Sequence, residues 1–543
     1  MKKLLKKTIA FALALACFAA CLAGCGTGST NDSTNNPAAP QDSGTEVAEK
    51  RTVRFGLSSD PGTLDPFSSF SGARRFTVLY PIYETLATQN GSIYELCMCK
   101  EYKEVEGAAT PTYDVVLWDN IKDSAGNPFT ADDLVWCVNL HKENGVVQEM
   151  AHVQGAEKID DYTARITMSD TTVGAFLSFM MGTPMVTKAA YEASGDDKMA
   201  THPVGTGPYV LSGYTSGDKL TYARNENYWQ PAEQQTSIFQ KQNAETFEIL
   251  IIKEATQAAI ALQNGDIDFY DGITNEAAAT FEENFPNISV GNVYSGGAIL
   301  MFCNCSEGSV FADNLALREC VMHAVDVDAF ITGVTNNVGV PLHDLASPFA
   351  VDYLDTFDSE AYFPFDIEYC KQKLEEAGYK PGELKLRILL ATMPDCATLG
   401  LMMQANFEEI GIELELLNYE NALYEQYKTN PEEWDLLIDI SGLTYMADFY
   451  RKLDAREYSA ETKSACFVDD DKLYELVALA DSEDTTSDEA KQAAHDYVVE
   501  QAYARGIYSY GALYGYRNDV FSNVVFNSRS SCTAGCSEYT WDK

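Results

Sequence analysis

Residues 203–209 read Pro203-Val204-Gly205-Thr206-Gly207-Pro208-Tyr209, and a second run reads Arg224-Asn225-Glu226-Asn227-Tyr228-Trp229. Glycine accepts backbone conformations that other residues avoid, and proline fixes its own φ. The two glycines of the first run therefore predict a tight turn, and Pro208 sets the direction in which the chain leaves it. The second run predicts a turn that packs on the protein rather than one that contacts a ligand.

Strand-like and helix-like segments alternate on both sides of these runs. Residues 113–117 and 164–168 alternate apolar and polar side chains in part, which predicts half-buried strands. A further strand is expected at residues 412–416, directly after a helix that ends at Gly411. The alternation predicts an α/β fold.

Helix starts are the clearer signals. Thr130 with Asp133 three residues later is close to a capping box, and apolar residues follow at helical spacing. Asp313 and Asp366 are predicted to cap two further helices. Gly378 is expected to end the helix that Asp366 begins.

The composition limits the possible partners. The 543 residues include 81 acidic and 38 basic side chains, and the formal net charge is −43. This negative field repels nucleic acids and anionic lipid headgroups, so the sequence excludes DNA, RNA and electrostatic membrane binding. A cationic or zwitterionic ligand remains compatible. About 490 residues follow the N-terminal region, which predicts two or three domains.

The N-terminus has the pattern of an export signal. Four lysines precede an apolar run at residues 8–22 that is too short to span a bilayer, and Leu22-Ala23-Gly24-Cys25 closes it. This ending resembles the bacterial lipobox, so we expect a lipoprotein signal peptide at residues 1–24. The Cys25 thiolate would carry a diacylglyceryl group, and two acyl chains suffice for stable anchoring.

The segment after Cys25 is predicted to be a tether. Residues 26–50 consist almost entirely of small and polar residues, with no apolar run that could join a core. We therefore expect a disordered tether at residues 25–50. The protein would lie at the cell membrane, lipid-anchored on its extracytoplasmic side.

Eleven further cysteines follow Cys25. The pairs Cys97/Cys99 and Cys303/Cys305 lack the spacing and the nearby histidines of a zinc site, so no metal site is predicted. Most of the thiols are expected to be small buried side chains. The pair that we favour for a disulfide is Cys532 with Cys536.

Catalytic motifs are missing from the sequence. It contains no nucleophile elbow, no zinc-protease helix, no phosphate-binding loop and no dinucleotide fingerprint. Of its six histidines, His141 and His323 fall within amphipathic helices, which favours a structural role. We therefore predict no enzyme activity and no cofactor.

Eight short runs resemble, in order, the motifs of the solute-binding lipoproteins of the oligopeptide, dipeptide and nickel type, which serve ABC importers. The resemblance covers nearly the whole chain after the tether. The runs are residues 60–66, 82–86, 126–135, 203–209, 224–229, 265–268, 318–326 and 374–379.

The resemblance implies two α/β lobes that enclose ligand in a cleft, with an extra subdomain in a discontinuous first lobe. Lobe I would comprise residues 51–94, 206–298 and 506–543, with the extra subdomain at 95–205. Lobe II would comprise residues 299–505. The hinge crossings would then lie near residues 298–302 and 503–508. A monomer that captures peptides and delivers them to ABC permease subunits is the implied function.

The resemblance also implies one ligand contact. Peptide binders of this family pair a cleft aspartate with the peptide α-ammonium, and Tyr445-Met446-Ala447-Asp448-Phe449 looks similar to the segment that carries it. Asp448 is thus the candidate ammonium partner and Tyr445 a candidate aromatic wall. Some relatives have an arginine six residues earlier, where this chain has Gly442, so nothing indicates how a peptide carboxylate would be held.

Other functions remain open on the sequence. The same fold could carry an oligosaccharide or chelated nickel, although scarce histidine argues modestly against direct metal ligation. Aromatic residues near the C-terminus could stack on sugar rings, but packing against the first lobe is the favoured role; they are Tyr503, Tyr508, Tyr510, Tyr514 and Tyr516. A surface-anchored hydrolase or a sensor is the third alternative.

Overall fold

The computed structural model describes residues 52–68, 75–90, 93–172, 174–350, 352–359, 362–442, 445–457, 466–481, 488–526 and 532–542. All of them belong to one compact unit, residues 50–543. The predictions for the signal peptide, Cys25 and the tether fall outside the described residues.

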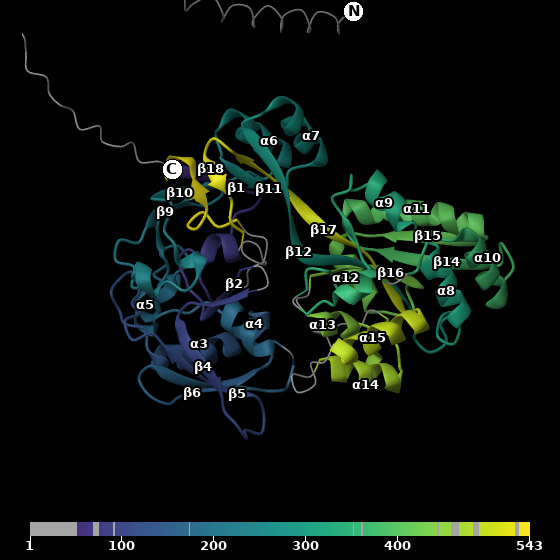
Figure 1. The fold of residues 1–543 in the computed structure, drawn as a ribbon, viewed down its shortest axis with the longest axis horizontal. Coiled ribbons are helices and arrows are strands. Elements are labelled where there is room, and N and C mark those ends of the chain that lie inside the picture. The colour runs from purple at the N-terminus through teal and green to yellow at the C-terminus, as the bar shows by residue number, and fades with distance from the viewer. Residues whose placement is uncertain are drawn as a thin grey trace, which may run out of the picture. The chain divides into compact units, whose positions relative to one another are not determined.

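The described residues combine strands and helices along the whole unit (Figure 1). The strands are β1 Thr52–Leu57, β2 Ala87–Asn90, β3 Ile93–Leu96, β4 Cys99–Glu104, β5 Thr112–Leu117, β6 Val153–Lys158, β7 Thr163–Met168, β8 Tyr209–Thr215, β9 Lys219–Arg224, β10 Thr246–Ile251, β11 Phe269–Asp271, β12 Ile288–Cys303, β13 Val340–Pro341, β14 Leu384–Leu390, β15 Ile412–Asn418, β16 Leu436–Ser441, β17 Ala504–Arg517, β18 Phe521–Asn523 and β19 Glu538–Tyr539. The α-helices are α3 Ala131–Asn144, α4 Ala175–Gly182, α5 Lys188–Ala193, α6 Ala255–Asn264, α7 Asn275–Asn284, α8 Leu315–His323, α9 Val327–Gly333, α10 Ile367–Glu376, α11 Pro394–Ile410, α12 Asn421–Lys428, α13 Met446–Arg451, α14 Asp471–Ala480 and α15 Asp488–Gln501.

One large sheet organises the unit. Its strand order is β15-β14-β16-β12-β17-β11-β1-β10-β9-β8, with β13 paired to β17. The long strands β12 and β17 run antiparallel side by side in its middle (Figure 1). At one end β12 pairs with β16, and at the other β17 pairs with β11. The two long strands therefore connect two groups of strands.

Each group contains parallel strands. β14 runs parallel to β15 and β16, and β1 runs parallel to β10 and β11. Parallel strands end at a common edge, and in open α/β sheets this carboxyl edge is where ligands usually bind. The loops after β11, β14 and β16 are therefore the first places to look for a site.

The buried apolar side chains form separate cores on the two sides of the long strands. Every member of the largest core lies between Ala298 and Tyr508. A second core joins residues from Val53 to Phe269 with residues near the C-terminus, and a small third core lies between Ala258 and Ile288. The four-stranded sheet β4-β5-β7-β6 contributes to the second core. It therefore packs with the strand group that contains β1, and the part of the unit built on the second core is called the β1 side.

The strands and helices predicted from the sequence are mostly confirmed. The expected strands correspond to β5, β7 and β15, and Asp366 caps α10 by accepting from the Tyr369 N–H. The predicted cap at Asp313 is wrong, because α8 begins one residue later. There the Asn314 side chain accepts a hydrogen bond from the Leu317 N–H.

The Gly205 and Gly207 turn is explained differently from the prediction. Neither glycine has a positive φ. Instead, a Cβ on Gly205 would collide with the Ile82 backbone, and one on Gly207 with the backbone of both Pro81 and Ile82. The Gly207 N–H donates to the Ile82 carbonyl at 2.8 Å. Close approach of two backbone segments, rather than a special turn conformation, requires glycine here.

The cysteines also differ in one respect from the prediction. All eleven described cysteines are buried free thiols, which fits the expectation for most of them. The favoured disulfide between Cys532 and Cys536 is absent. Instead, the Cys536 thiol donates to the Thr533 carbonyl at 3.6 Å, and Cys532 lies 4.0 Å from the Ser537 hydroxyl.

Candidate ligand-binding cleft

A cavity of about 340 Å³ lies at the carboxyl edges of both strand groups. One wall is the loop after β11, from Gly272 to Asn275, and another is Asp395, five residues after the end of β14. The floor includes Tyr508 and Tyr510 of β17. Residues from both sides of the long strands thus line one cavity.

The two tyrosines of this floor have different neighbours. Tyr508 is buried, packs against Phe330, and places its hydroxyl 3.3 Å from the Asp395 carboxylate. Tyr510 occupies the space beside Gly297, where a Cβ would overlap its ring. The other aromatics in this part of the chain pack internally: Tyr514 lies against Phe269. The packing role predicted for most of these residues therefore agrees with their contacts.

Tyr445 stands at the same carboxyl edge, between β16 and α13. Its hydroxyl lies 3.1 Å from the Tyr94 hydroxyl in β3. Its ring occupies the space that the missing side chain of Gly174 leaves, next to the start of α4. Nearby, Arg451 donates to the Thr172 hydroxyl at 3.3 Å. The segment that follows β16 therefore touches residues on the other side of the long strands, which pack with the core that includes β1.

Asp448 lies in the first turn of α13. Its carboxylate accepts a hydrogen bond from the Tyr445 backbone, which is an ordinary helix-start role. Arg451 is its cationic neighbour at 3.4 Å, but the same guanidinium makes a closer ion pair with Asp481. The Asp448 side chain is 29% exposed. The side chain is thus held in place while part of it still faces solvent.

Burial decides the pKa of Asp448. Desolvation raises its pKa above the usual value, Arg451 lowers it, and Asp352 raises it again. Asp352 itself accepts a hydrogen bond from the Met446 N–H at 2.8 Å and lies 3.9 Å from Lys491. A cation that reached Asp448 would relieve the desolvation cost, since an opposite charge favours the ionised carboxylate.

A buried polar cluster holds α13 in position. Asp344 accepts hydrogen bonds from Tyr450 of α13 and from His495 of α15, the latter at 2.6 Å. All three side chains are buried. Removing one member would leave a buried polar group without its partner, which is costly.

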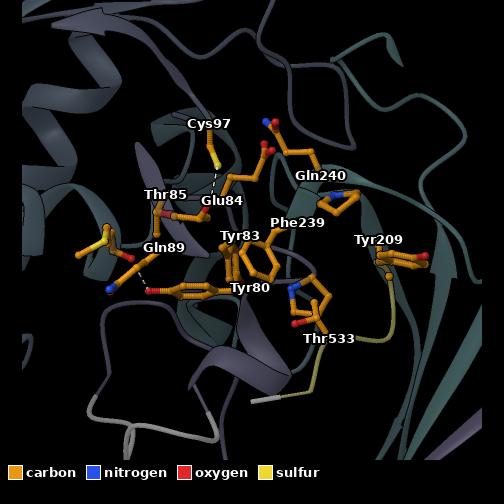
Figure 2. A pocket seen from close by; sticks show the side chains of 15 residues that line it. Tyr80, Tyr83, Glu84, Thr85, Gln89, Cys97, Tyr209, Phe239, Gln240 and Thr533 are labelled. Atoms are coloured by element: carbon orange, nitrogen blue, oxygen red, sulfur yellow. Dashed lines mark hydrogen bonds between the residues drawn. The ribbon is translucent and has the colours of Figure 1, made fainter. Parts of the chain in front are cut away.

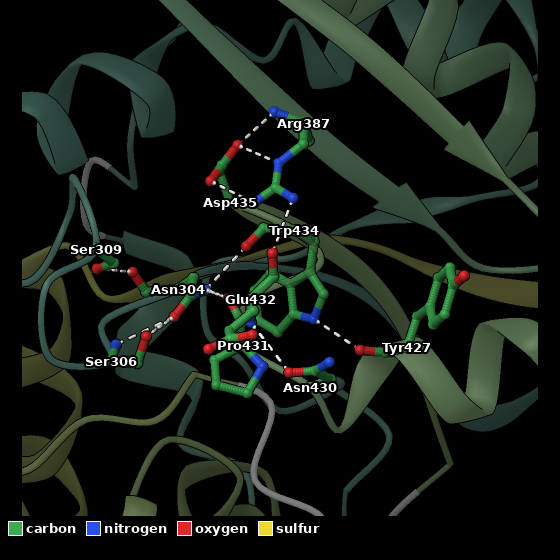
Figure 3. Close-up of polar contacts among 10 residues, drawn as sticks. All are labelled: Asn304, Ser306, Ser309, Arg387, Tyr427, Asn430, Pro431, Glu432, Trp434 and Asp435. Atoms are coloured by element: carbon green, nitrogen blue, oxygen red, sulfur yellow. Dashed lines mark hydrogen bonds and ion pairs between the residues drawn. The ribbon is translucent and has the colours of Figure 1, made fainter.

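A second polar cluster fixes the start of β16 (Figure 3). Arg387 of β14 forms a two-pronged ion pair with Asp435, with contacts of 3.1 Å to each carboxylate oxygen. Asn304 donates to the Trp434 and Pro431 carbonyls. These contacts hold the start of β16, the strand that precedes Tyr445 and α13 in the chain.

A separate small cavity of about 60 Å³ lies within the β1 side (Figure 2). Glu84 on its wall accepts hydrogen bonds from Tyr228 at 2.5 Å and from the Trp229 indole at 2.7 Å. Burial raises the Glu84 pKa to about 6 despite these donors. The run at residues 224–229 therefore packs against residues 82–86, as the sequence predicts for it, and the cavity is too small for a peptide.

The structure brings together only some of the predicted site. Tyr445 and Asp448 both follow β16, and Tyr94 and Gly174 contact Tyr445. Asp395 lies instead in the cavity beside β17. No local motif marks these last three residues, because their positions depend on the folded chain. Among the residues that the structure describes, no group of three His, Cys, Asp or Glu side chains is placed to hold a metal ion.

The described part of the chain contains no helix both long and apolar enough to cross a membrane. The model of a protein family described as "Bacterial extracellular solute-binding proteins, family 5 Middle" matches residues 100–451, well over half of the chain.

Curated relatives match over about half of their length. A heme-binding protein A from Haemophilus influenzae is 25% identical over 299 residues, which are 53% of this chain and 51% of that protein. A glutathione-binding protein from Shigella boydii is 26% identical over 279 residues, 50% of this chain and 51% of that protein. Protein XP55 from Streptomyces lividans is 26% identical and covers 64% of this chain and 60% of its own.

Solved structures share the fold. HbpA2 from Haemophilus parasuis superposes with a TM-score of 0.78 at 18% identity, covering 90% of this chain and 100% of that chain. The oligopeptide-binding protein AppA from Bacillus subtilis, in complex with a nonapeptide, gives 0.67 at 17% identity, covering 90% and 98%. The fold is therefore the two-lobed α/β fold of these binding proteins, and the family consists of binding proteins rather than enzymes. The chain belongs to the family 5 bacterial extracellular solute-binding proteins.

Proposed function

We propose that this protein is the lipid-anchored substrate-binding component of an ABC importer, and that its cargo is peptide. The observation that carries the proposal is the position of Asp448. It lies in the first turn of α13, the helix that follows β16, close to Tyr445, which touches Tyr94 on the β1 side of the long strands. A ligand placed there would contact both sides at once.

The proposed lobes follow the division of the cores. Lobe I would comprise residues 51–94, 206–298 and 506–543, with the extra subdomain at 95–205, and lobe II residues 299–505. The separate cores on either side of β12 and β17 support this division, and the two strands would be the hinge. A ligand that touches both lobes would stabilise the closed arrangement by its differential affinity.

Peptide is favoured over the other cargoes by the charge at the site. Asp448 keeps a partly exposed, desolvated carboxylate for which a peptide α-ammonium is a suitable partner. Relatives named for glutathione and a nonapeptide complex are consistent with this choice.

The membrane role rests on Cys25. A diacylglyceryl group there would anchor the chain on the extracytoplasmic side, and residues 25–50 would tether the folded unit near the permease. Import and sensing would use the same binding step.

Ligand identification tests the proposal directly. The mature protein is incubated with peptide and glycan pools, washed, denatured, and the released molecules are identified by mass spectrometry. Retained intact peptides support the proposal, whereas retained glycans or cleaved products would contradict it. Deletion of the genes for the ABC permease subunits, followed by uptake of a labelled retained peptide, separates import from sensing.

A further inference from the structure

The cavity between the loop after β11 and Asp395 carries charge of one sign. Among the described residues that line it, Asp395 is charged, and no lysine, arginine or histidine occurs. The Tyr508 hydroxyl lies 3.3 Å from the Asp395 carboxylate and directs it. No described cationic side chain forms an ion pair with Asp395, so this negative charge is open to a ligand.

Two helices begin at the cavity, and helix N-termini attract anions. The chain's own carboxylates already occupy both positive ends. Glu276 lies in the first turn of α7, and Asp395 lies in the first turn of α11, where Pro394 also removes one N–H donor. A ligand carboxylate would meet like charge here without the guanidinium that normally binds it.

We propose that this cavity receives a cationic group of the cargo and excludes a free carboxylate. The inference rests on the proposed peptide function and narrows the cargo to one class of peptide. The cargo is a peptide with a lysine-like or arginine-like side chain, which Asp395 binds while Asp448 binds the α-ammonium. The peptide carboxylate lies elsewhere.

Matched peptide pools test this specificity. Di- to pentapeptides of one set contain lysine, and those of a second set contain norleucine, which keeps the aliphatic stem without the charge. Each set is made with a free carboxylate and with a C-terminal amide. Retention on the mature protein is measured by mass spectrometry, and affinities of the retained peptides by calorimetry.

We expect lysine peptides to be retained over norleucine peptides. Asp395→Asn should weaken the lysine peptides on the order of tenfold and leave norleucine peptides unchanged. Asp395→Glu keeps the charge and should restore most of the affinity. Asp328→Asn, which neutralises an exposed acid on α9 outside the cavity, is the matched control and should have no effect.

Two outcomes would overturn the inference. Retention that does not depend on lysine, or equal loss for both sets in Asp395→Asn, would overturn it while the peptide function stands. Retention of no peptide from any pool would overturn the proposed function and this inference with it.

Discussion

The hydroxyls of Tyr445 and Tyr94 lie 3.1 Å apart, although the two residues are 351 positions apart in the chain. Tyr94 belongs to β3 on the β1 side, whereas Tyr445 follows β16 on the other side of the long strands. The same Tyr445 ring fills the space beside Gly174. One aromatic side chain thus joins two regions that only tertiary structure brings together, next to the candidate ammonium partner Asp448.

Gly174→Ala should weaken this contact. A Cβ at Gly174 would overlap the Tyr445 ring, and its φ of 69° also disfavours a side chain. We expect a larger radius of gyration than in the wild type, measured by small-angle scattering of the ligand-free protein. The double variant Gly174→Ala/Tyr445→Ala removes the overlap and serves as the control. If Gly174→Ala scatters as the wild type does, the contact does not hold the two sides together.

Asp271→Asn should stabilise the folded protein at neutral pH. Burial raises the Asp271 pKa to about 6, so the folded state binds the proton more tightly than the unfolded state does. Wild-type stability therefore falls as the pH rises from the ordinary aspartate value to about 6, and it stays lower above that. The neutral amide avoids this cost, which is up to about 3 kcal/mol.

Urea unfolding of wild type and Asp271→Asn at acidic and at neutral pH measures the effect. The two proteins should differ most at neutral pH and least in acid. Asp519→Asn is the contrasting variant, because Asp519 forms an ion pair with Arg517. It should not raise the stability of the folded protein to urea. A difference between wild type and Asp271→Asn that does not vary with pH would contradict the desolvation argument.

Cys25→Ala should prevent lipid attachment, because only a thiol can accept the glyceryl group. Metabolic labelling with an alkyne fatty acid, followed by membrane fractionation, measures the outcome. We expect the label on the wild type and none on the variant, which should be unprocessed or released. Persistent label on Cys25→Ala would rule out this anchor.

The sequence predicts the fold class and many element boundaries because those signals are local. The Asp366 cap and the strand at β15 depend on neighbouring residues and are confirmed. The Gly205 and Gly207 run is also recognisable, but its physical reason is not, since the backbone that crowds these glycines comes from residues 81–82.

The site is less predictable from the sequence. Asp448 and Tyr445 can be named by resemblance, yet their partners Tyr94, Gly174 and Arg451 come from separate segments or from the next helical turn. Asp395 resembles any acidic residue at a helix start. Its position in a cavity without lysine, arginine or histidine among the described lining residues becomes visible only when β11, β14 and β17 are assembled.

The central claim is that Asp448 binds the α-ammonium of a peptide, and calorimetry tests it most directly. Wild type and Asp448→Asn are each titrated with a retained peptide and with its N-acetylated form, which gives a double-mutant cycle. Asp448→Asn should weaken the free-amine peptide by about 2–5 kcal/mol, because one partner of a desolvated pair is lost. Acetylated peptide should bind the wild type poorly and be little affected by the substitution. Unchanged affinity of Asp448→Asn for the free-amine peptide would contradict the account.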